Sequence, residues 1–325
     1  MNPKVSVIIP VYNSSKYIAR CCHSLFGQTF DSLQYIFVDD GSDDGSLDVI
    51  KEILSEYPNR LPQVSFLIHD ENKGVGAARQ YGLAESRGEY VTHCDSDDWV
   101  ESDAYRILYE KAISEDADIV TCAYCIDSED GTTIKTVPSI QNDSKELSFD
   151  IGPRTGSLVL KLIRRDLILN NNLQVPRKLK WGEDFCLSLE SLLLSRKTVC
   201  VNLPLYHYVQ HKDSLTHTLT TEKCLSLINC GHVIESFLKQ HNLSSNYVYQ
   251  LNWLKFQLKQ YLLVFPQTRD IQLWKSHYPE CHQDILSYPS ASYLKLSAWL
   301  IVHHMTPVAR FVLQSRDLIS SYKNR

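Results

Sequence analysis

The first hundred residues alternate between short apolar runs and longer segments in which apolar residues recur at helical spacing. Four runs are rich in Val, Ile, Phe and Tyr: VSVIIPVY (5–12), YIFVDD (35–40), VSFLIHD (64–70) and EYVTHCD (89–95). Continuous runs of this length are typical of parallel strands that are buried on both faces. The segments between them, 14–28, 46–57 and 76–88, predict helices. This alternation predicts an α/β fold with a mostly parallel, Rossmann-like sheet.

The pattern after residue 100 is mixed. It predicts helices over 102–116, 157–172 and 184–195, and extended segments over 117–127 and 197–210. From about residue 221 onward, the apolar residues recur at helical spacing throughout. We therefore expect an α/β domain over residues 1–220 and a helical C-terminal extension over residues 221–325.

Composition narrows the class of protein. The chain has 325 residues, of which 43% are hydrophobic and 22% charged, as in ordinary globular proteins. Its net charge of -5 argues against a nucleic-acid partner, which would require a basic surface. The ten cysteines lie in apolar runs or, like Cys122 and Cys125, lack the second ligand pair of a zinc site, so we expect thiols packed in the core. Neither a signal-peptide pattern nor an apolar run of roughly 18 to 20 residues is present, which predicts a cytoplasmic protein.

Polar residues gather where the predicted strands end. The residues that follow or end these strands are Tyr12, Asn13, Asp39, Asp40, Asp95, Asp97 and Asp98. The carboxyl ends of parallel strands meet at one edge of a sheet, and open α/β sheets bind their ligands there. The sequence therefore predicts one functional rim.

The acidic stretch HCDSDDWV (93–100) is the part of this rim with the clearest chemistry. Asp95 and Asp97 share a face if the segment is extended, because side chains two residues apart point the same way. Carboxylate oxygens are preferred ligands of Mg²⁺ and Mn²⁺, and such ions often link a protein to a substrate diphosphate. An acidic turn before a helix accounts equally for Asp95–Asp98, and a glycine-rich turn accounts for VDDGSDDGS (38–46). The residues alone leave these alternatives open.

The segment GVGAAR (74–79) suggests a dinucleotide-binding fingerprint, but its context is wrong. Arg79 occupies the position of the third glycine, and the segment follows the third predicted strand instead of the first. We therefore do not expect a nicotinamide cofactor.

Four segments in a fixed order resemble the inverting family-2 glycosyltransferases of the GT-A fold. They are 5–30, 35–46, 72–100 and WGEDFCLSLESL (181–192), and the resemblance spans roughly residues 4 to 216. Within that family the chain is most similar to bacterial enzymes that assemble capsule, O-antigen and lipooligosaccharide. The resemblance implies a GT-A-type domain that transfers a sugar from a UDP-sugar donor, with inversion, to a saccharide or lipid-linked acceptor.

The resemblance also implies roles for individual residues. Those that would bind the donor nucleotide are Pro10, Val11, Tyr12, Asp40, Asn72, Arg79, Asp95 and Ser96. Among them, Asp40 would accept a hydrogen bond from the uracil N3–H. Asp97 and His211 would hold Mg²⁺ or Mn²⁺, which stabilises the departing diphosphate.

Asp184 corresponds to the catalytic base of the family, with Glu183 and Asp98 in support. An acceptor hydroxyl is a poor nucleophile, and a carboxylate that removes its proton as it attacks accelerates the reaction. An Asp that only caps the following helix is the alternative for Asp184.

The chain departs from the family where an arginine is common, because Val209 stands there and His211 occupies the next basic position. For segment 156–168, the basic residues Lys161, Arg164 and Arg165 either wall the acceptor side or form a solvated basic face. The C-terminal helices mix Trp, Leu and Val with basic residues. This pattern fits core packing and also a helix at the anionic inner face of a membrane.

Two other functions and the oligomeric state, with a homodimer as one option, remain open. A nucleotidyltransferase acting on sugar phosphates would also use an acidic pair, but PVYNSSKY (10–17) is not the glycine-rich basic loop expected after its first strand. A non-catalytic nucleotide-sugar-binding protein would not need both the acidic stretch and Asp184.

Overall fold

The computed structural model describes residues 2–138, 145–211 and 219–323. Contacts divide the chain into two units. One consists of Met1–Ser148 and Gly152–Ser214, and the other of Phe149–Ile151 and Leu215–Arg325. The predicted boundary at residue 220 stays a prediction, and so does the association with an acceptor or a membrane surface that we expect of residues 221–325.

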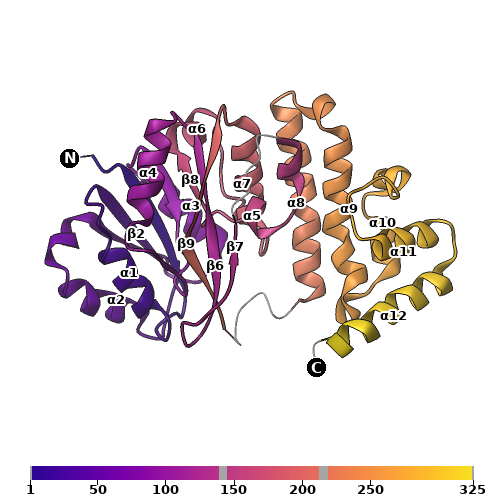
Figure 1. The fold of residues 1–325 in the computed structure, drawn as a ribbon, viewed down its shortest axis with the longest axis horizontal. Helices are drawn as coiled ribbons and strands as arrows, with labels where there is room; N and C mark the ends of the chain where they lie inside the picture. The colour runs from indigo at the N-terminus through magenta and orange to yellow at the C-terminus, as the bar shows by residue number, and fades with distance from the viewer. Residues whose placement is uncertain (1, 139–144, 212–218, 324–325) are drawn as a thin grey trace. The chain divides into compact units, whose positions relative to one another are not determined.

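The first unit is built on a sheet whose strand order is β3-β2-β1-β4-β8-β6-β9-β5, with β7 paired to β6 (Figure 1). The four predicted N-terminal strands are β1 (Val5–Val11), β2 (Leu33–Asp39), β3 (Val64–Ile68) and β4 (Tyr90–His93). All four run parallel. Every residue of β1 and β2 is buried, which explains why these runs are continuously apolar.

The helices that connect these strands cover both faces of the sheet. They are α1 (Ile18–Phe26), α2 (Ser46–Ser55) and α3 (Val75–Glu85). α1 and α2 pack on the face that carries Val7, Ile9 and Phe37. α3 approaches the other face so closely that a Cβ at Gly82 would lie 2.5 Å from Cγ2 of Ile8. The glycine is therefore needed for this contact.

The rest of the sheet is mixed. It consists of β5 (Trp99–Val100), β6 (Ile119–Ser128), β7 (Thr133–Val137), β8 (Lys161–Arg164) and β9 (Thr198–Gln210), with helices α4 (Ala104–Ser114), α5 (Pro153–Gly156), α6 (Arg165–Asn170) and α7 (Glu183–Leu194). β9 runs parallel to β6, whereas β8 is antiparallel to both β4 and β6.

The helix predicted over 157–172 is wrong in its first half. Lys161–Arg164 form strand β8, and α6 begins only at Arg165. Leu162 and Ile163 are buried between the neighbouring strands β4 and β6, so pairing in the sheet overrides the helical spacing of this run.

The second unit is helical, as predicted. Its helices are α8 (Thr221–Gln240), α9 (Val248–Val264), α10 (Ile271–Ser276), α11 (Ser292–Val302) and α12 (Thr306–Lys323). The side chain of Thr220 caps α8 by accepting a hydrogen bond from the backbone N–H of Lys223. Among the described residues, no helix combines the length and the hydropathy that crossing a bilayer requires.

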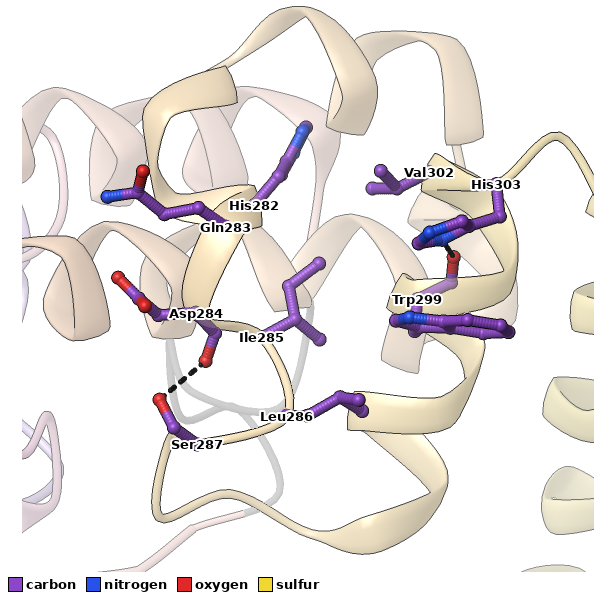
Figure 2. A pocket seen from close by; sticks show the side chains of 9 residues that line it. All are labelled: His282, Gln283, Asp284, Ile285, Leu286, Ser287, Trp299, Val302 and His303. Atoms are coloured by element: carbon purple, nitrogen blue, oxygen red, sulfur yellow. Dashed lines mark hydrogen bonds between the residues drawn. The ribbon is translucent and has the colours of Figure 1, made fainter.

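This unit contains a shallow cavity of about 570 Å³ between the segment 282–287 and α11. Figure 2 shows Ile285 and Leu286 pointing toward the indole of Trp299. His303 stacks on that indole with a centroid separation of 4.1 Å. None of the residues predicted to bind the donor nucleotide, to hold the metal or to act as the base lines this cavity.

Candidate active site

The loops that follow β1, β2 and β4 form the predicted rim, and serine side chains tie them together. The backbone N–H of Ser14 donates to Oγ of Ser46, at 2.8 Å. The hydroxyl of Ser14 lies 2.7 Å from the hydroxyl of Ser96 in the acidic stretch. Three segments that are distant in sequence therefore converge on Ser14. Sequence reasoning missed this residue because serine is common after a strand.

The turn after β2 is fixed by its own acids. Asp44 accepts hydrogen bonds from the backbone N–H groups of Ser15 (2.8 Å) and Ser46 (3.0 Å). Partial burial opposes ionisation, but these bonds outweigh it and lower the pKa of Asp44 to about 2. Asp44 therefore stays ionised and links the turn to the backbone of Ser15 after β1.

The three residues predicted to line a base pocket differ in exposure. Pro10 and Val11 are buried, and Val11 belongs to the hydrophobic core. Tyr12 is 51% exposed. Of the three, Tyr12 is therefore the one whose side chain offers surface to a ligand.

Asp40 is buried and already has several protein partners. Its Oδ1 accepts from the backbone N–H of Lys73 at 3.0 Å and lies 2.6 Å from Nδ1 of His69. Its Oδ2 accepts from the N–H of Gly74 at 2.8 Å. Asp40 thus anchors the loop before α3, which also carries Asn72. The predicted contact between Asp40 and uracil stays a prediction.

Arg79 connects the acidic stretch to helix α7. Its Nη2 donates to Asp95 at 2.8 Å and its Nη1 to Glu183 at 2.5 Å. Burial alone would lower the pKa of Arg79, but neighbouring carboxylates raise it above its usual range. The guanidinium therefore stays charged and holds together residues that lie 88 positions apart in the sequence.

Asp184 lies in the first turn of α7, which Gly182 opens with a positive φ of 91°. Burial raises the pKa of the Asp184 carboxyl, and Asp95 raises it further, whereas Arg79 and Lys161 lower it. Asp184 therefore lies close enough to the acidic stretch for the charge of Asp95 to raise its pKa. The fold therefore joins the two acidic motifs that the sequence singles out, although it does not test their predicted roles.

Asp97 and Asp98 have different surroundings. Asp98 is buried and accepts hydrogen bonds from the hydroxyl of Tyr206 (2.5 Å) and the N–H of Val209 (2.8 Å). It therefore anchors β9. Burial and the charge of Asp95 raise the pKa of Asp97 to about 6, against a backbone hydrogen bond and the positive charge of Arg79.

His211 is buried, and neither ring nitrogen has a hydrogen-bond partner among the described residues. The ring stacks on Tyr17 with a centroid separation of 4.0 Å, and Nδ1 is 3.6 Å from a carboxylate oxygen of Glu129. That separation is too long for a hydrogen bond. A buried imidazole whose nitrogens make no hydrogen bond to a described residue is costly, and a bound cation would use its nitrogen lone pair. The predicted metal role of His211 fits this environment.

A second group of potential ligands lies on β6 and β9. Cys125, Asp127 and His207 have ligand atoms within 4.8 Å of one another, the one such group of three among the described residues. Asp127 accepts hydrogen bonds from Trp99 (3.1 Å) and Thr133 (2.8 Å), and His207 bridges Asp127 (2.8 Å) and Glu101 (3.0 Å). The oxygens of Asp127 and both ring nitrogens of His207 thus have protein partners without an ion. Trp99 also stacks on His207, so this cluster fixes the strand that follows the acidic stretch.

The expected alternative of a solvated basic face over 156–168 is wrong for Lys161, whereas Arg164 and Arg165 are half-buried. Lys161 is only 1% exposed, and its ammonium group donates to main-chain carbonyls. Arg164 forms ion pairs with Asp116 and Asp118. Both side chains bind other parts of the protein because β8 is an internal strand, paired with β4 and β6.

Comparison with known proteins identifies the family and the fold. The profile described as "Glycosyl transferase family 2" matches residues 6–169. The putative glycosyltransferase EpsH of Bacillus subtilis (strain 168) is 33% identical over 260 residues, which cover 77% of this chain and 73% of EpsH.

Two solved structures share the fold. The crystal structure of S. aureus TarS 1-349 in complex with UDP-GlcNAc has a TM-score of 0.68 at 19% identity and covers 97% of this chain and 92% of that chain. The mannosyltransferase PcManGT from Pyrobaculum calidifontis, in complex with GDP-Man and Mn²⁺, has a TM-score of 0.54 at 14% identity and covers 96% and 86%. These likenesses confirm the predicted α/β fold class.

Proposed function

Because the chain belongs to glycosyl transferase family 2, and is therefore a glycosyltransferase, we propose that it transfers a sugar from a UDP-sugar with inversion to a saccharide or lipid-linked acceptor. The product would be part of a bacterial cell-surface polysaccharide. The observation that carries the proposal is the link through Arg79, which joins Asp95 on the rim to the first turn of α7, where Asp184 lies.

The rim supports the donor side of the reaction. Tyr12 offers an exposed aromatic face for a base, and the loop that Asp40 anchors brings Asn72 toward the same edge. Asp95 and Ser96 stand at the end of β4, where a ribose and a diphosphate would meet the acidic stretch. A UDP-sugar is favoured because a TarS structure with the same fold contains UDP-GlcNAc.

Asp184 would act on the acceptor side. Burial makes its carboxylate a stronger base, while the positive charges of Arg79 and Lys161 keep it ionised. It would take the proton of the acceptor hydroxyl as that oxygen attacks the anomeric carbon. Attack on the face opposite the leaving UDP inverts the configuration at that carbon.

Mg²⁺ or Mn²⁺ is the expected cofactor, and Asp97 and His211 would hold it. The fit rests on the two ring nitrogens of His211, which have no hydrogen-bond partner among the described residues, and on the electrostatic coupling between His211 and Asp97. When bound, the cation supplies positive charge that stabilises the departing diphosphate. Asp98 supports this site indirectly, because it fixes β9 next to the acidic stretch.

If the acceptor is lipid-linked, the protein would bind peripherally to the inner face of the membrane. Helix α12 buries Ala309 and Leu313, so core packing accounts for one of its faces. The opposite side exposes 51% of Val308 and 70% of Phe311, next to Arg310. Exposed apolar residues beside a basic one suit an anionic bilayer surface. Sedimentation with vesicles of phosphatidylglycerol and phosphatidylcholine tests this, and Phe311→Ser should weaken the binding.

Product analysis separates the proposed function from its alternatives. The protein is incubated with Mn²⁺ and a panel of UDP-sugars, and release of UDP is followed. UDP release supports the transferase. Pyrophosphate release from UTP and a sugar phosphate would instead indicate a nucleotidyltransferase activity, and absence of UDP release with every sugar of the panel would contradict the proposed UDP-sugar donor.

A further inference from the structure

Lys161 is a buried lysine whose hydrogen bonds go to neutral groups. It is the first residue of β8, and its Nζ donates to the carbonyl oxygens of Ser157 (2.8 Å) and Arg154 (3.3 Å). Burying an ammonium group is costly unless its hydrogen bonds are satisfied. Burial lowers the pKa of Lys161 to about 7, and the nearby Asp184 and Cys122 oppose this effect. The presence of an ammonium group at this buried position therefore needs a physical explanation.

The carbonyls that Lys161 binds belong to the short helix α5 and to the residue after it, which lie next to α7. The hydroxyl of Ser188, on α7, donates to the carbonyl of Thr155 at 2.6 Å. A Cβ at Gly156 would lie 3.1 Å from the ring of Phe185, the residue after Asp184. Residues 154–157 are thus held by Lys161 on one side and pack against the first turns of α7 on the other.

Lys161 differs from the other charged residues around Asp184 in its hydrogen-bond partners. Arg79 from α3 faces it, but the guanidinium is already bound by Asp95 and Glu183. Glu183 and Asp95 carry the same sign as Asp184 and favour its protonation. Lys161 contributes a positive charge that forms no ion pair with a carboxylate in the described part of the chain, since its hydrogen bonds go to carbonyls.

We propose that Lys161 is a positioning residue for Asp184: its ammonium group fixes residues 154–157 beneath the first turn of α7 and supplies the charge that stabilises the Asp184 carboxylate. The inference rests on the proposed function, in which Asp184 takes the proton of the acceptor. The positive charge matters most at low pH. There, a carboxylate without it would be protonated and unable to act as a base.

Two substitutions separate the charge from the hydrogen bonds. Lys161→Gln keeps an N–H donor for the carbonyls and removes the charge, whereas Lys161→Arg keeps both. The rate of UDP release during transfer is measured from about pH 5.5 to 9. Lys161→Gln should move the acidic limb of the profile upward by about one pH unit, which is about a tenfold loss of rate below the limb. Lys161→Arg should restore the limb toward that of the wild type.

Lys259→Met is the matched control. Lys259 is also buried, donates to the carbonyl of His277 at 2.7 Å, and belongs to the second unit. Its loss should lower the thermal stability without moving the acidic limb. The inference would be overturned if the acidic limb lies at the same pH in Lys161→Gln and Lys161→Arg. It would also be overturned if Lys259→Met moves the acidic limb as far as Lys161→Gln does.

The same assay distinguishes this failure from failure of the proposed function. Turnover by the wild type that Asp184→Asn abolishes supports Asp184 as the base. With that result, an unmoved limb in Lys161→Gln rejects the Lys161 inference alone. Undiminished turnover by Asp184→Asn rejects the base assignment and, with it, the role of Lys161.

Discussion

The proposed donor side and the proposed acceptor side of the site are built in different ways. The donor side consists of loops at the ends of β1, β2 and β4, joined by short hydrogen bonds of Ser14 and Asp44. The acceptor side consists of the first turn of α7 and the residues below it, held by the buried charges of Arg79 and Lys161. Removing one hydrogen bond between neighbouring loops costs little stability, whereas removing one partner of a buried charge costs much more. Damage to the acceptor side should therefore cost more.

Asp184→Asn should produce the largest effect on the chemical step. The amide cannot take a proton, so the turnover number should fall by about 10²- to 10⁴-fold, the range typical of general base catalysis. Because the change is isosteric, the affinity for the UDP-sugar should stay close to that of the wild type. Initial rates of transfer check this, and activity near that of the wild type would contradict the assignment of the base.

Arg79→Met should damage both sides at once. It leaves the buried carboxylate of Glu183 without its partner and disconnects Asp95 from α7. Breaking a buried ion pair in this way costs about 3 to 5 kcal/mol of unfolding free energy. Urea denaturation measures the loss. Arg79→Met combined with Glu183→Met should recover part of it, and a lack of recovery would show that the pair is not the source.

His211→Ala should act on the metal requirement and leave the fold largely unchanged. The alanine variant loses the stacking on Tyr17 and the 3.6 Å contact with Glu129, but no hydrogen bond to a described residue. The Mn²⁺ concentration for half-maximal rate should rise by about tenfold or more, by analogy with weakened metal sites. His207→Ala is the contrast, because it breaks bonds to Asp127 and Glu101 and should lower stability. An unchanged Mn²⁺ requirement in His211→Ala would remove it from the site.

Ser14→Ala should produce the smallest effect. It removes the side-chain contact with Ser96 but retains the backbone bond to Ser46, so about 1 kcal/mol is expected. The Michaelis constant for the donor should rise a few-fold with the turnover number unchanged. An effect on turnover larger than that on the Michaelis constant would mean that Ser14 matters beyond the donor side.

The position of the proposed donor side was largely predictable from the sequence, because its acidic residues directly end or follow the apolar runs that form the strands. Asp39 ends one of the apolar runs that are typical of buried parallel strands, and Asp95 and Asp97 follow another. The predicted GT-A-type fold with its C-terminal helices is confirmed. The acceptor side was less predictable. The run containing Lys161 has the apolar content of either a helix or a buried strand, and pairing with β4 and β6 decides between them.

The residues that sequence reasoning missed have partners distant in the chain. Trp99, Asp127 and His207 come from three strands, and each looks ordinary in its own segment. The partners of Lys161 are backbone carbonyls, which leave no trace in the residue types. Buried polar clusters of this kind become visible only once the strands are placed.

The central claim is that the rim holds the donor and its cation while Asp184 acts on the acceptor. Calorimetric titration of UDP in the presence of Mn²⁺ into Asp97→Asn and Asp184→Asn tests this division most directly. The account predicts that Asp97→Asn loses the Mn²⁺-dependent part of UDP binding, whereas Asp184→Asn binds UDP within about twofold of the wild type. Loss of UDP binding in Asp184→Asn, or full Mn²⁺-dependent binding in Asp97→Asn, would contradict it.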